Sequence, residues 1–299
     1  MTNPITHCGF IAIVGQPNVG KSTLLNCILG KKLSITSDKP QTTRHSITGI
    51  KSIGEAQLVF VDTPGLHRGG KRALNRVMNK TAKSVLSDVD VVLFVVNALQ
   101  WDQQDEAVLQ LLKKNSAPII LVINKIDKVK QRERLLPFIE AISQKLAFAK
   151  IIPISAQKGT QVEDLEHEII QYLPESPHMY DDDQLTDRSD GFIASEIIRE
   201  KLTRSLGEEL PYALTVGIEL MEEEEDQLNI AAVIWVEREG QKGIVVGKGG
   251  EVLKKVGTQA RIDMERYFEQ KVFLKLWVKV KSNWSDDEKL LNHLGYGEQ

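Results

Sequence analysis

The chain of 299 residues contains only two cysteines, Cys8 and Cys27, both in or beside the first predicted strand and helix. Two cysteines so placed provide no disulfide framework, which argues against a small disulfide-stabilised module. Together with the six histidines they show no metal-ligand spacing, so the sequence gives no reason to expect a zinc site. The formal net charge of −3 is small and by itself favours no class of partner.

Long hydrophobic runs are also missing. The apolar run at 91–96 is far too short to span a bilayer and is typical of a buried parallel strand. The apolar run at 10–14 is short and leads directly into a glycine-rich stretch, so no signal peptide is visible. No internal repeat or low-complexity tract stands out. We therefore expect a cytoplasmic enzyme or switch, and the chain is long enough for two domains with a sizeable core in each.

A glycine-rich motif follows the first apolar run. Residues 15–22 read GQPNVGKS and fit the pattern G-x-x-x-x-G-K-[ST], between a predicted strand at 10–14 and a predicted helix at 23–29. In this context the backbone N–H groups of the loop point at a di- or triphosphate, at a helix N-terminus that favours anions. The lysine would reach the outer phosphates and Ser22 would ligate Mg²⁺. The predicted phosphate-binding residues of this loop are Gly15, Asn18, Val19, Gly20, Lys21, Ser22 and Thr23.

Three further polar motifs each follow an apolar, strand-like run: 62–65 (DTPG), 124–127 (NKID) and 155–159 (SAQKG). Open α/β sheets bind their ligands at the carboxyl ends of such strands. The order and spacing of the four motifs resemble those of the Ras-like P-loop GTPases. The resemblance implies an α/β fold with a mostly parallel sheet and helices on both faces.

Asp127 offers two adjacent carboxylate oxygens. Guanine presents two adjacent donors, N1–H and N2–H₂, whereas adenine presents an acceptor there, so a bidentate carboxylate selects guanine. The resemblance implies that Asn124 contacts the base edge and braces the loops, and that the stem of Lys125 lies over the base plane. It also implies that the N–H of Ala156, in the loop that begins at Ser155, meets the guanine O6.

The stretch 34–46 is polar, contains a proline and has no clear period, which predicts a mobile loop. Its Thr42-Thr43-Arg44 motif is similar to the first switch of the TrmE-Era-Der branch of these GTPases. The resemblance implies that a threonine hydroxyl completes the Mg²⁺ shell only while the γ-phosphate is present. Thr43 is favoured for this role over Thr42.

The resemblance further implies that Asp62 holds Mg²⁺ through water and that the Gly65 N–H contacts the γ-phosphate. The predicted switch residues of this second motif are Asp62, Thr63, Pro64 and Gly65.

The residue after this second motif is Leu66, where Ras-type proteins place a glutamine that orients the attacking water. In the related branch, an asparagine at the position of Asn18 helps to hold K⁺ near the phosphates. We therefore expect slow basal hydrolysis that is faster in K⁺ than in Na⁺. His67 is more often a solvated side chain in such a loop, so we assign no catalytic general base.

The first domain is predicted to end with an amphipathic helix at 162–173, stopped by prolines at 174 and 177. The acidic, aperiodic segment that follows is interpreted as a linker; the alternative is an ordered acidic loop on the first domain. The predicted division is residues 1–175 for the GTPase domain, 176–188 for the linker and 189–299 for the second domain.

The second domain is predicted to run helix, strand, strand, helix, strand. The expected elements are a helix at 192–202, strands at 213–220, 228–236 and 272–280 with a charged hairpin tip at 222–226, a helix after residue 250 and a short helix at 286–294. The tetrapeptide at 247–250 fits the GXXG loop of KH domains, which clamps about four single-stranded nucleotides, and the order of elements resembles the type II form. The predicted RNA-binding residues are Gly247, Lys248, Gly249, Gly250, Lys254 and Lys255.

The stretch 241–281 is basic, which fits a nucleic-acid face. It contains lysine or arginine at 242, 248, 254, 255, 261, 266, 271, 275, 279 and 281, against acids at 251, 263, 265 and 269. The lysines of the last strand could instead form its solvated face. We expect Trp277 to pack in the core rather than to serve as a base-stacking platform.

A GTPase domain of this branch followed by a KH domain is similar to the Era family, over nearly the whole chain. The resemblance implies a GTP-hydrolysing switch that binds the single-stranded 3′ region of small-subunit ribosomal RNA and acts in small-subunit assembly. It implies Mg²⁺ and K⁺ as cofactors, a monomer, and weak peripheral association with the inner membrane. The residues alone indicate a GTPase coupled to an RNA clamp. Two alternatives stay open: a GTPase that controls RNA modification or maturation, and an RNA-binding scaffold with a degenerate GTPase site.

Overall fold

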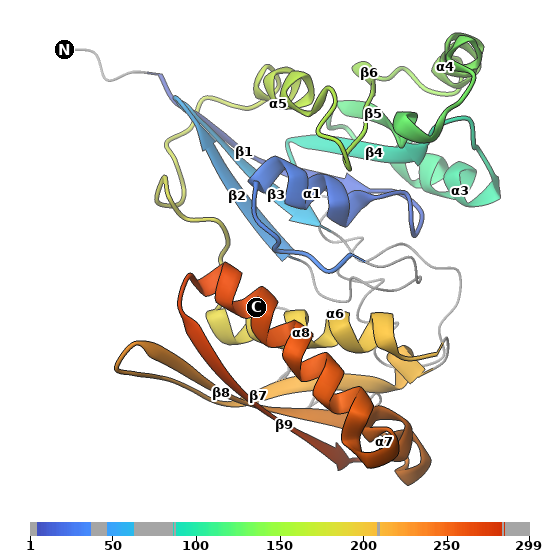
Figure 1. Ribbon diagram of the computed structural model, residues 1–299. Helices are drawn as coiled ribbons and strands as arrows, with labels where there is room; N and C mark the ends of the chain where they lie inside the picture. Colours follow the sequence, from blue (N-terminus) through green and yellow to red (C-terminus); the bar gives the residue numbers. More distant parts are fainter. Residues whose placement is uncertain are drawn as a thin grey trace. The chain divides into compact units, whose positions relative to one another are not determined.

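The computed structural model describes residues 5–36, 47–62, 86, 88–207, 210–282 and 284 (Figure 1). These residues divide into two compact units, the first with 5–34, 47–62, 86 and 88–187 and the second with 35–36 and the residues from 188 onward. Several predicted features lie outside the described residues: Thr42, Thr43, Thr63, Pro64, Gly65, Leu66, His67 and the helix expected at 286–294.

The first unit is built on a six-stranded sheet in the order β2-β3-β1-β4-β5-β6, in which only β2 is antiparallel to its neighbour. This mostly parallel sheet confirms the predicted fold class. Its strands are β1 (His7–Val14), β2 (Ile47–Ile53), β3 (Ala56–Asp62), β4 (Val91–Asn97), β5 (Ile119–Asn124) and β6 (Lys150–Pro153). Its α-helices are α1 (Lys21–Leu29), α3 (Gln103–Leu112), α4 (Leu135–Ser143) and α5 (Val162–Ile170), with 3₁₀ turns at Ile126–Lys128 and Arg132–Arg134.

Helices cover both faces of this sheet (Figure 1). On one face, α3 and α4 pack Leu112 and Ile142 against Phe94 and Leu121. On the other, α1 contacts β2, β3 and α5. The residues of β4 from 91 to 96 are fully buried, which is why the strand has a continuous apolar run instead of an alternating one.

The strand order fixes where the motifs meet. β1 lies between β3 and β4. The strands that follow it in sequence lie on both sides of it, β2 and β3 toward one edge of the sheet and β4, β5 and β6 toward the other. The carboxyl end of β1 is therefore a topological switch point, where open α/β sheets bind ligands. The register pairs Ile13 with Asp62 and Asn97 with Asn124. The phosphate-binding loop and the ends of β3 and β5 therefore lie at one edge of the sheet.

The segment 176–187, predicted to be a linker, is hydrogen-bonded to the first unit. The amide of Gln57 accepts hydrogen bonds from the backbone N–H groups of Met179 and Tyr180 and donates one to the Tyr180 carbonyl. Thr186 donates its hydroxyl to the Thr48 carbonyl at 2.7 Å. In the structure this acidic segment is an irregular but anchored strip along β2 and β3.

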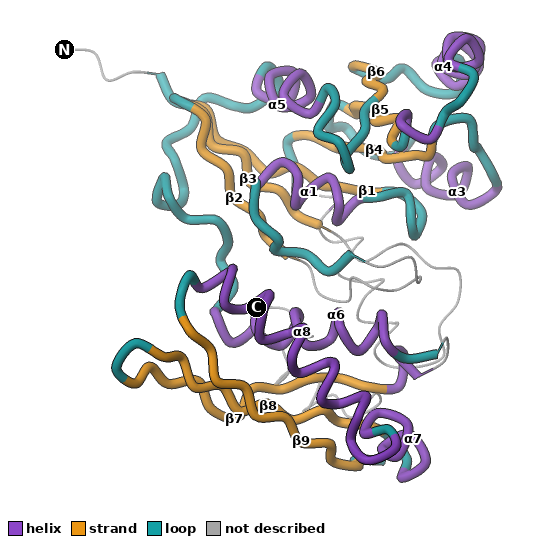
Figure 2. The backbone as a smooth tube through the Cα atoms, in the orientation of Figure 1, coloured by secondary structure: helices purple, strands orange, loops and turns teal. Residues whose placement is uncertain are grey.

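The second unit is a three-stranded sheet with helices on one face (Figure 2). β7 pairs with β8 antiparallel, and β8 pairs with β9 in parallel. The elements are α6 (Asp190–Ser205), a 3₁₀ turn (Leu210–Ala213), β7 (Leu214–Glu224), β8 (Gln227–Val236), α7 (Glu239–Val246), a 3₁₀ turn (Lys248–Gly250), α8 (Glu251–Phe268) and β9 (Lys271–Val280).

Two elements of this unit differ from the prediction. Helix α7 was not expected, because Gly240 and Gly243 lower its intrinsic helix propensity. The Gln241 side chain compensates by accepting the backbone N–H groups of Glu237 and Arg238 at the helix start. Strand β7 continues through the charged residues to Glu224, so the hairpin turn is confined to Glu225 and Asp226.

Candidate functional site

The loop at 15–22 can be formed only with glycine at two positions. Gly15 has φ 150°, and a Cβ there would overlap the carbonyl oxygen of Val95. Gly20 has φ 99°, and a Cβ there would overlap the amide of Asn124. Helix α1 begins directly after this glycine and receives no side-chain cap. Its N-terminal N–H groups therefore face the loop, where they suit an anion.

The Lys21 side chain is buried beneath this loop, only 7% exposed. Its ammonium donates to the carbonyl oxygens of Gly15 and Gln16, both at 2.9 Å. Burial lowers the pKa of Lys21 to about 8, and the Asp62 carboxylate opposes this shift. Two neutral carbonyls are weak partners for a buried ammonium, so phosphate oxygens would stabilise its charge better.

Asp62 lies at the end of β3 and is fully buried. Its Oδ2 accepts hydrogen bonds from the hydroxyls of Ser22 and Ser34, each at 3.0 Å, while its Oδ1 has no partner among the described residues. Burial raises the pKa of Asp62, and Lys21 and the two hydroxyls oppose the shift. A carboxylate with an unpartnered oxygen beside a hydroxyl fits Mg²⁺, which takes few protein oxygens and completes its shell with phosphate and water.

Asn124 joins three loops through one buried amide. Its Nδ2 donates to the Val19 carbonyl at 2.9 Å, and its Oδ1 accepts the N–H groups of Lys125 at 2.7 Å and Ala156 at 3.0 Å. The phosphate loop and the 155–159 loop thus keep a fixed separation, as the predicted bracing role requires.

The residues predicted to bind guanine gather next to Asn124. Ser155 donates its hydroxyl to Asp127 Oδ1 at 2.6 Å, which orients the carboxylate. Lys125 has a left-handed backbone with φ 67°, and its ammonium donates to the carbonyl of Asn18. The structure therefore brings together every described member of the predicted GTP site.

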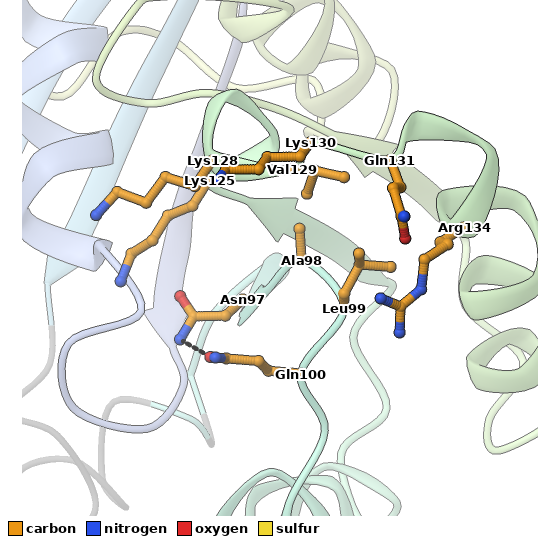
Figure 3. Close-up of a pocket in the computed structure, with 10 residues that line it drawn as sticks. All are labelled: Asn97, Ala98, Leu99, Gln100, Lys125, Lys128, Val129, Lys130, Gln131 and Arg134. Carbon is orange, nitrogen blue, oxygen red and sulfur yellow. Dashed lines mark hydrogen bonds between the residues drawn. The ribbon is translucent and has the colours of Figure 1, made fainter.

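A cationic hollow of about 580 Å³ adjoins these loops (Figure 3). Its apolar lining comes from Ala98, Leu99 and Val129, and its polar lining from Asn97, Gln100, Lys125, Lys128, Lys130, Gln131 and Arg134. Four of these lining residues are cationic and none is acidic, so the hollow suits an anionic group. Among the predicted site residues that the structure describes, only Lys125 lines it.

The GXXG loop of the second unit also depends on glycine. A Cβ on Gly247 would lie 2.5 Å from Val252 Cγ2, so no larger residue fits. Gly249 and Gly250 have φ 61° and 81°, and a Cβ on either would meet no atom within 4 Å. The loop therefore leaves room for a phosphate backbone at the N-terminus of the 18-residue helix α8. The lysines predicted to bind RNA (Lys248, Lys254 and Lys255) are all exposed around it.

Residues 10–125 match the model of the 50S ribosome-binding GTPase family, and residues 209–285 match that of the KH domain. GTPase Era of Coxiella burnetii (strain Dugway 5J108-111) is 57% identical over 98% of this chain and 99% of its own length. GTPase Era of Marinobacter nauticus is 57% identical over 99% of this chain and 97% of its own.

This chain belongs to the Era family. Two solved Era structures each superpose with a TM-score of 0.94 over 98% of this chain and 100% of theirs. One is a variant of Aquifex aeolicus Era bound to GDP·AlF₄⁻, 39% identical, and the other is Era in complex with MgGDPNP and nucleotides 1506–1542 of 16S ribosomal RNA, 40% identical. As a member of the Era family, the chain is a GTPase with a KH domain.

Sequence reasoning missed several residues of this Era-family site. The Gln16 side chain is held by Asp105, and Ser34 shares Asp62 with Ser22. Asn26 fixes the chain at Ser34 by donating to its carbonyl at 2.7 Å and accepting its N–H at 2.8 Å. These partners lie outside the motifs. The spacing of Asp102 and Asp105 signals a helix start, which α3 has, but not a contact with the phosphate loop.

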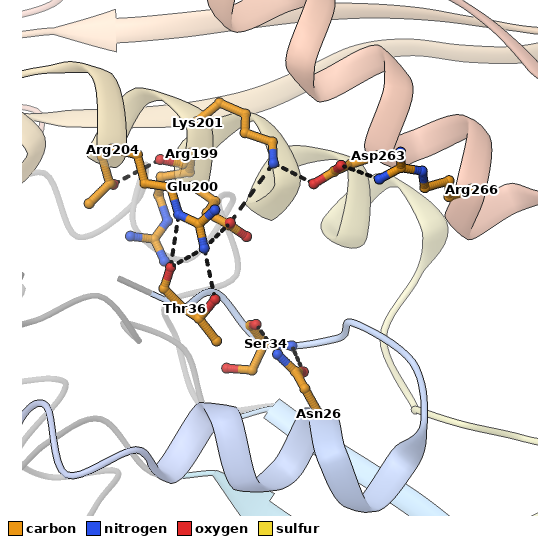
Figure 4. A network of polar contacts seen from close by, with 10 residues as sticks. Asn26, Ser34, Thr36, Arg199, Glu200, Lys201, Arg204, Asp263 and Arg266 are labelled. Atoms are coloured by element: carbon orange, nitrogen blue, oxygen red, sulfur yellow. Dashed lines mark hydrogen bonds and ion pairs between the residues drawn. The ribbon is translucent and has the colours of Figure 1, made fainter. Parts of the chain in front are cut away.

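A polar network connects α6 with Thr36 within the second unit (Figure 4). Arg204 ion-pairs with Glu200 at 2.8 Å and donates to the Thr36 carbonyl at 2.8 and 3.1 Å and to its hydroxyl at 2.9 Å. Lys201, on the same helix, pairs with Asp263 of α8. Thr36, next to the predicted first switch, is thereby tied to the helix pair that carries the GXXG loop.

No helix among the described residues is long and apolar enough to cross a membrane.

Proposed function

We propose that this protein is a GTP-controlled switch that binds the single-stranded 3′ region of small-subunit ribosomal RNA during assembly of the small subunit. The observation that carries the proposal is that one chain of the Era family combines two glycine-dependent phosphate-binding loops, at 15–22 and at 247–250. The related Era solved with MgGDPNP and 16S RNA supports both ligands for this chain.

In the nucleotide site, we assign the phosphates to the N–H groups of the loop and to the Lys21 ammonium, which would exchange two carbonyl partners for phosphate oxygens. Ser22 and Asp62 would hold Mg²⁺, with Thr43 as the third protein group and Gly65 on the γ-phosphate. The bound Mg²⁺ would neutralise charge on the β- and γ-phosphates. Asp127, Asn124, Lys125, Ser155 and Ala156 would select the base, with Asp127 held in place by the Ser155 hydroxyl.

For hydrolysis, the position of Leu66 leaves no side chain to orient water as glutamine does in Ras-type proteins. We propose that K⁺, held by Asn18, supplies positive charge near the transferred phosphate. Asn18 lies within the phosphate loop at 15–22 and has a left-handed backbone, with φ 64°. Basal hydrolysis is then slow, and stimulated by K⁺.

We propose that nucleotide and RNA binding are coupled through the chain between Ser34 and Thr36. Ser34 shares a carboxylate with the Mg²⁺ ligand Ser22, while Thr36 is hydrogen-bonded to Arg204. Ordering of residues 34–46 and 66–80 by GTP would change these contacts. By linkage, RNA must alter nucleotide affinity by the same factor that GTP alters RNA affinity.

The domain division at 1–175, 176–188 and 189–299 stays a proposal, as do the monomeric state, the cytoplasmic location and the weak peripheral association with the inner membrane. Sedimentation of the purified chain with and without vesicles of bacterial lipid composition tests the monomeric state and the membrane association, and fractionation of cells tests the cytoplasmic location.

The decisive experiment is crosslinking of the GTP-bound protein to total cellular RNA, with Gly249→Asp as control. A side chain at 249 occupies the open space at the GXXG loop, and its charge repels phosphate. A peak at the 3′ end of 16S RNA that the control lacks supports the proposal. A peak on tRNA, or equal signal in both proteins, rejects it. Lys21→Ala separates the switch from a scaffold, because a scaffold binds RNA equally well without nucleotide.

A further inference from the structure

Strand β9 carries an unusual pattern on its exposed side. Phe273 and Trp277 are 46% and 44% exposed, and they alternate with the exposed lysines Lys271, Lys275 and Lys279. The expectation that Trp277 packs in the core is therefore wrong. The strand reads KVFLKLWVKV, and the period of two places its aromatic rings and its lysines on one face.

This face of the sheet is turned away from the helices. α6 and α8 contact β7 and β9 on the side of the buried positions, such as Val272 of β9 and Ile230 and Ile234 of β8 (Figure 1). On the opposite side, the register places Trp235 of β8 beside Lys279 and Val233 beside Trp277. No helix of the described residues lies over this second face.

Cations and rings are close enough to act together. The Lys275 ammonium lies 5.2 Å from the Phe273 ring centroid, and the Lys279 ammonium lies 5.6 Å from that of Trp235. Acidic residues occupy the β7 side: Glu219 pairs with Lys279 at 2.8 Å, and Glu222 lies beyond it. The positive, aromatic strip therefore follows β9, and a polyanion would run along this strand.

We propose that the exposed face of β9 is a second RNA-binding surface, where two nucleobases of a single strand stack on Phe273 and Trp277 and phosphates contact Lys271 and Lys275. The two rings are four residues apart on a strand, or about 13 Å, with Lys275 between them. Sheets that bind single-stranded RNA use exposed aromatics in this way. Surfaces that bind another protein are depleted of lysine. The repeated lysines between the rings of β9 therefore favour a phosphate chain over a protein partner.

This inference rests on the proposed RNA-binding function and extends it. A GXXG loop clamps about four nucleotides. The RNA bound in the related Era complex runs from nucleotide 1506 to nucleotide 1542, far beyond that length. A second surface on the same domain would bind RNA that the clamp does not reach.

The test measures the affinity of the full chain for a labelled RNA of nucleotides 1506–1542, across a KCl series. Phe273→Ala and Trp277→Ala should each weaken binding by about tenfold. Lys271→Gln with Lys275→Gln should reduce the slope of log K against log salt by about 1.4, since each lost phosphate contact on a single strand contributes about 0.7. The matched control, Lys113→Gln with Lys114→Gln on exposed positions of the first unit, should leave the slope unchanged.

Trp277→Phe and Phe273→Tyr keep a ring and should restore most of the affinity, which distinguishes stacking from loss of fold. Ultraviolet crosslinks between the RNA and the peptide 271–281 in the wild type would also support the surface.

If all β9 variants bind like the wild type while Gly249→Asp does not bind, the surface is rejected and the proposed function stands. If the wild type itself fails to bind this RNA, both are rejected. If Trp277→Ala instead lowers the sedimentation coefficient and leaves RNA affinity unchanged, the RNA surface is rejected and the face is an interface between copies.

Discussion

Gln16 of the phosphate loop donates its side-chain amide to Asp105 Oδ2 at 2.9 Å, across 89 residues of sequence. Asp105 is fully buried in the first turn of α3, where its Oδ2 also receives the Asp102 N–H at 3.2 Å. The Gln16 carbonyl in turn receives the Lys21 ammonium. The start of α3 therefore positions the loop that holds the nucleotide, although it carries none of the predicted site residues.

Asp105 should make stability depend on pH. Burial raises its pKa to about 6, against an ordinary value of 3.8. In the window between these values, the folded protein keeps a proton that the unfolded chain has released, so the free energy of unfolding falls as the pH rises and levels off above about 6. Urea unfolding of the nucleotide-free protein at several pH values measures this. Asp105→Asn cannot titrate, so its curve should lack this fall, and parallel curves for the two proteins would contradict the assignment.

Asn124→Ala should impair the nucleotide site and the fold together. The substitution removes three hydrogen bonds and leaves the Val19 carbonyl and the Ala156 N–H buried without this partner, which costs about 1–3 kcal/mol of stability. Since the loops lose their brace, we expect GTP affinity to fall by about 100-fold. Titration calorimetry and chemical denaturation measure the two effects. Asn115→Ala, in the segment before the opposite end of β5, loses the hydrogen bond from its side chain to the Leu86 carbonyl; it is the control and should bind GTP normally.

The K⁺ proposal predicts a difference between salts. Single-turnover GTP hydrolysis should be at least about tenfold faster in KCl than in NaCl of the same ionic strength, because only K⁺ would occupy the site near Asn18. Asn18→Ala should bring the K⁺ rate down to the Na⁺ rate while GDP affinity changes little. Equal rates in both salts for the wild type would exclude the ion.

Arg204→Ala tests the coupling between the two ligands. The variant loses the hydrogen bonds to Thr36, so RNA affinity in the GTP state and in the GDP state should become similar, whereas the two affinities differ in the wild type. Arg266→Ala is the control, since this residue is exposed and pairs with Asp263 at a longer 3.7 Å. A ratio of the two affinities that is unchanged in Arg204→Ala would show that this contact does not transmit the nucleotide state.

That the predicted GTP-site residues gather at one place was predictable, because they lie in short motifs directly after apolar runs and a parallel sheet brings the ends of such runs to one edge. Asn124 and Asp127 were placed there in this way. Asp105 was not, because its contact with Gln16 depends on how α3 packs, which no local pattern encodes. Helix α7 was missed because its local sequence is misleading. Its glycines lower the helix propensity, and the hydrogen bonds that Gln241 accepts at the helix start compensate for this loss.

Trp277 shows where a usable signal was overlooked. It lies two residues from Lys275 and two from Lys279, so in an alternating strand all three side chains share one face. Residue type alone suggested burial, whereas the period of two placed the ring on the lysine side. The structure follows the period, with Trp277 44% exposed.

The parallel pairing of β8 with β9 also sets an order of events during translation. Because β9 joins the sheet only after α7 and α8, the RNA-binding unit cannot close until residue 280 has left the ribosome. The guanine loops are complete by residue 159, and domains generally fold in the order of synthesis. A nascent chain can thus bind nucleotide before its RNA-binding surface has formed. The newly made protein would then already carry a nucleotide when it first meets RNA.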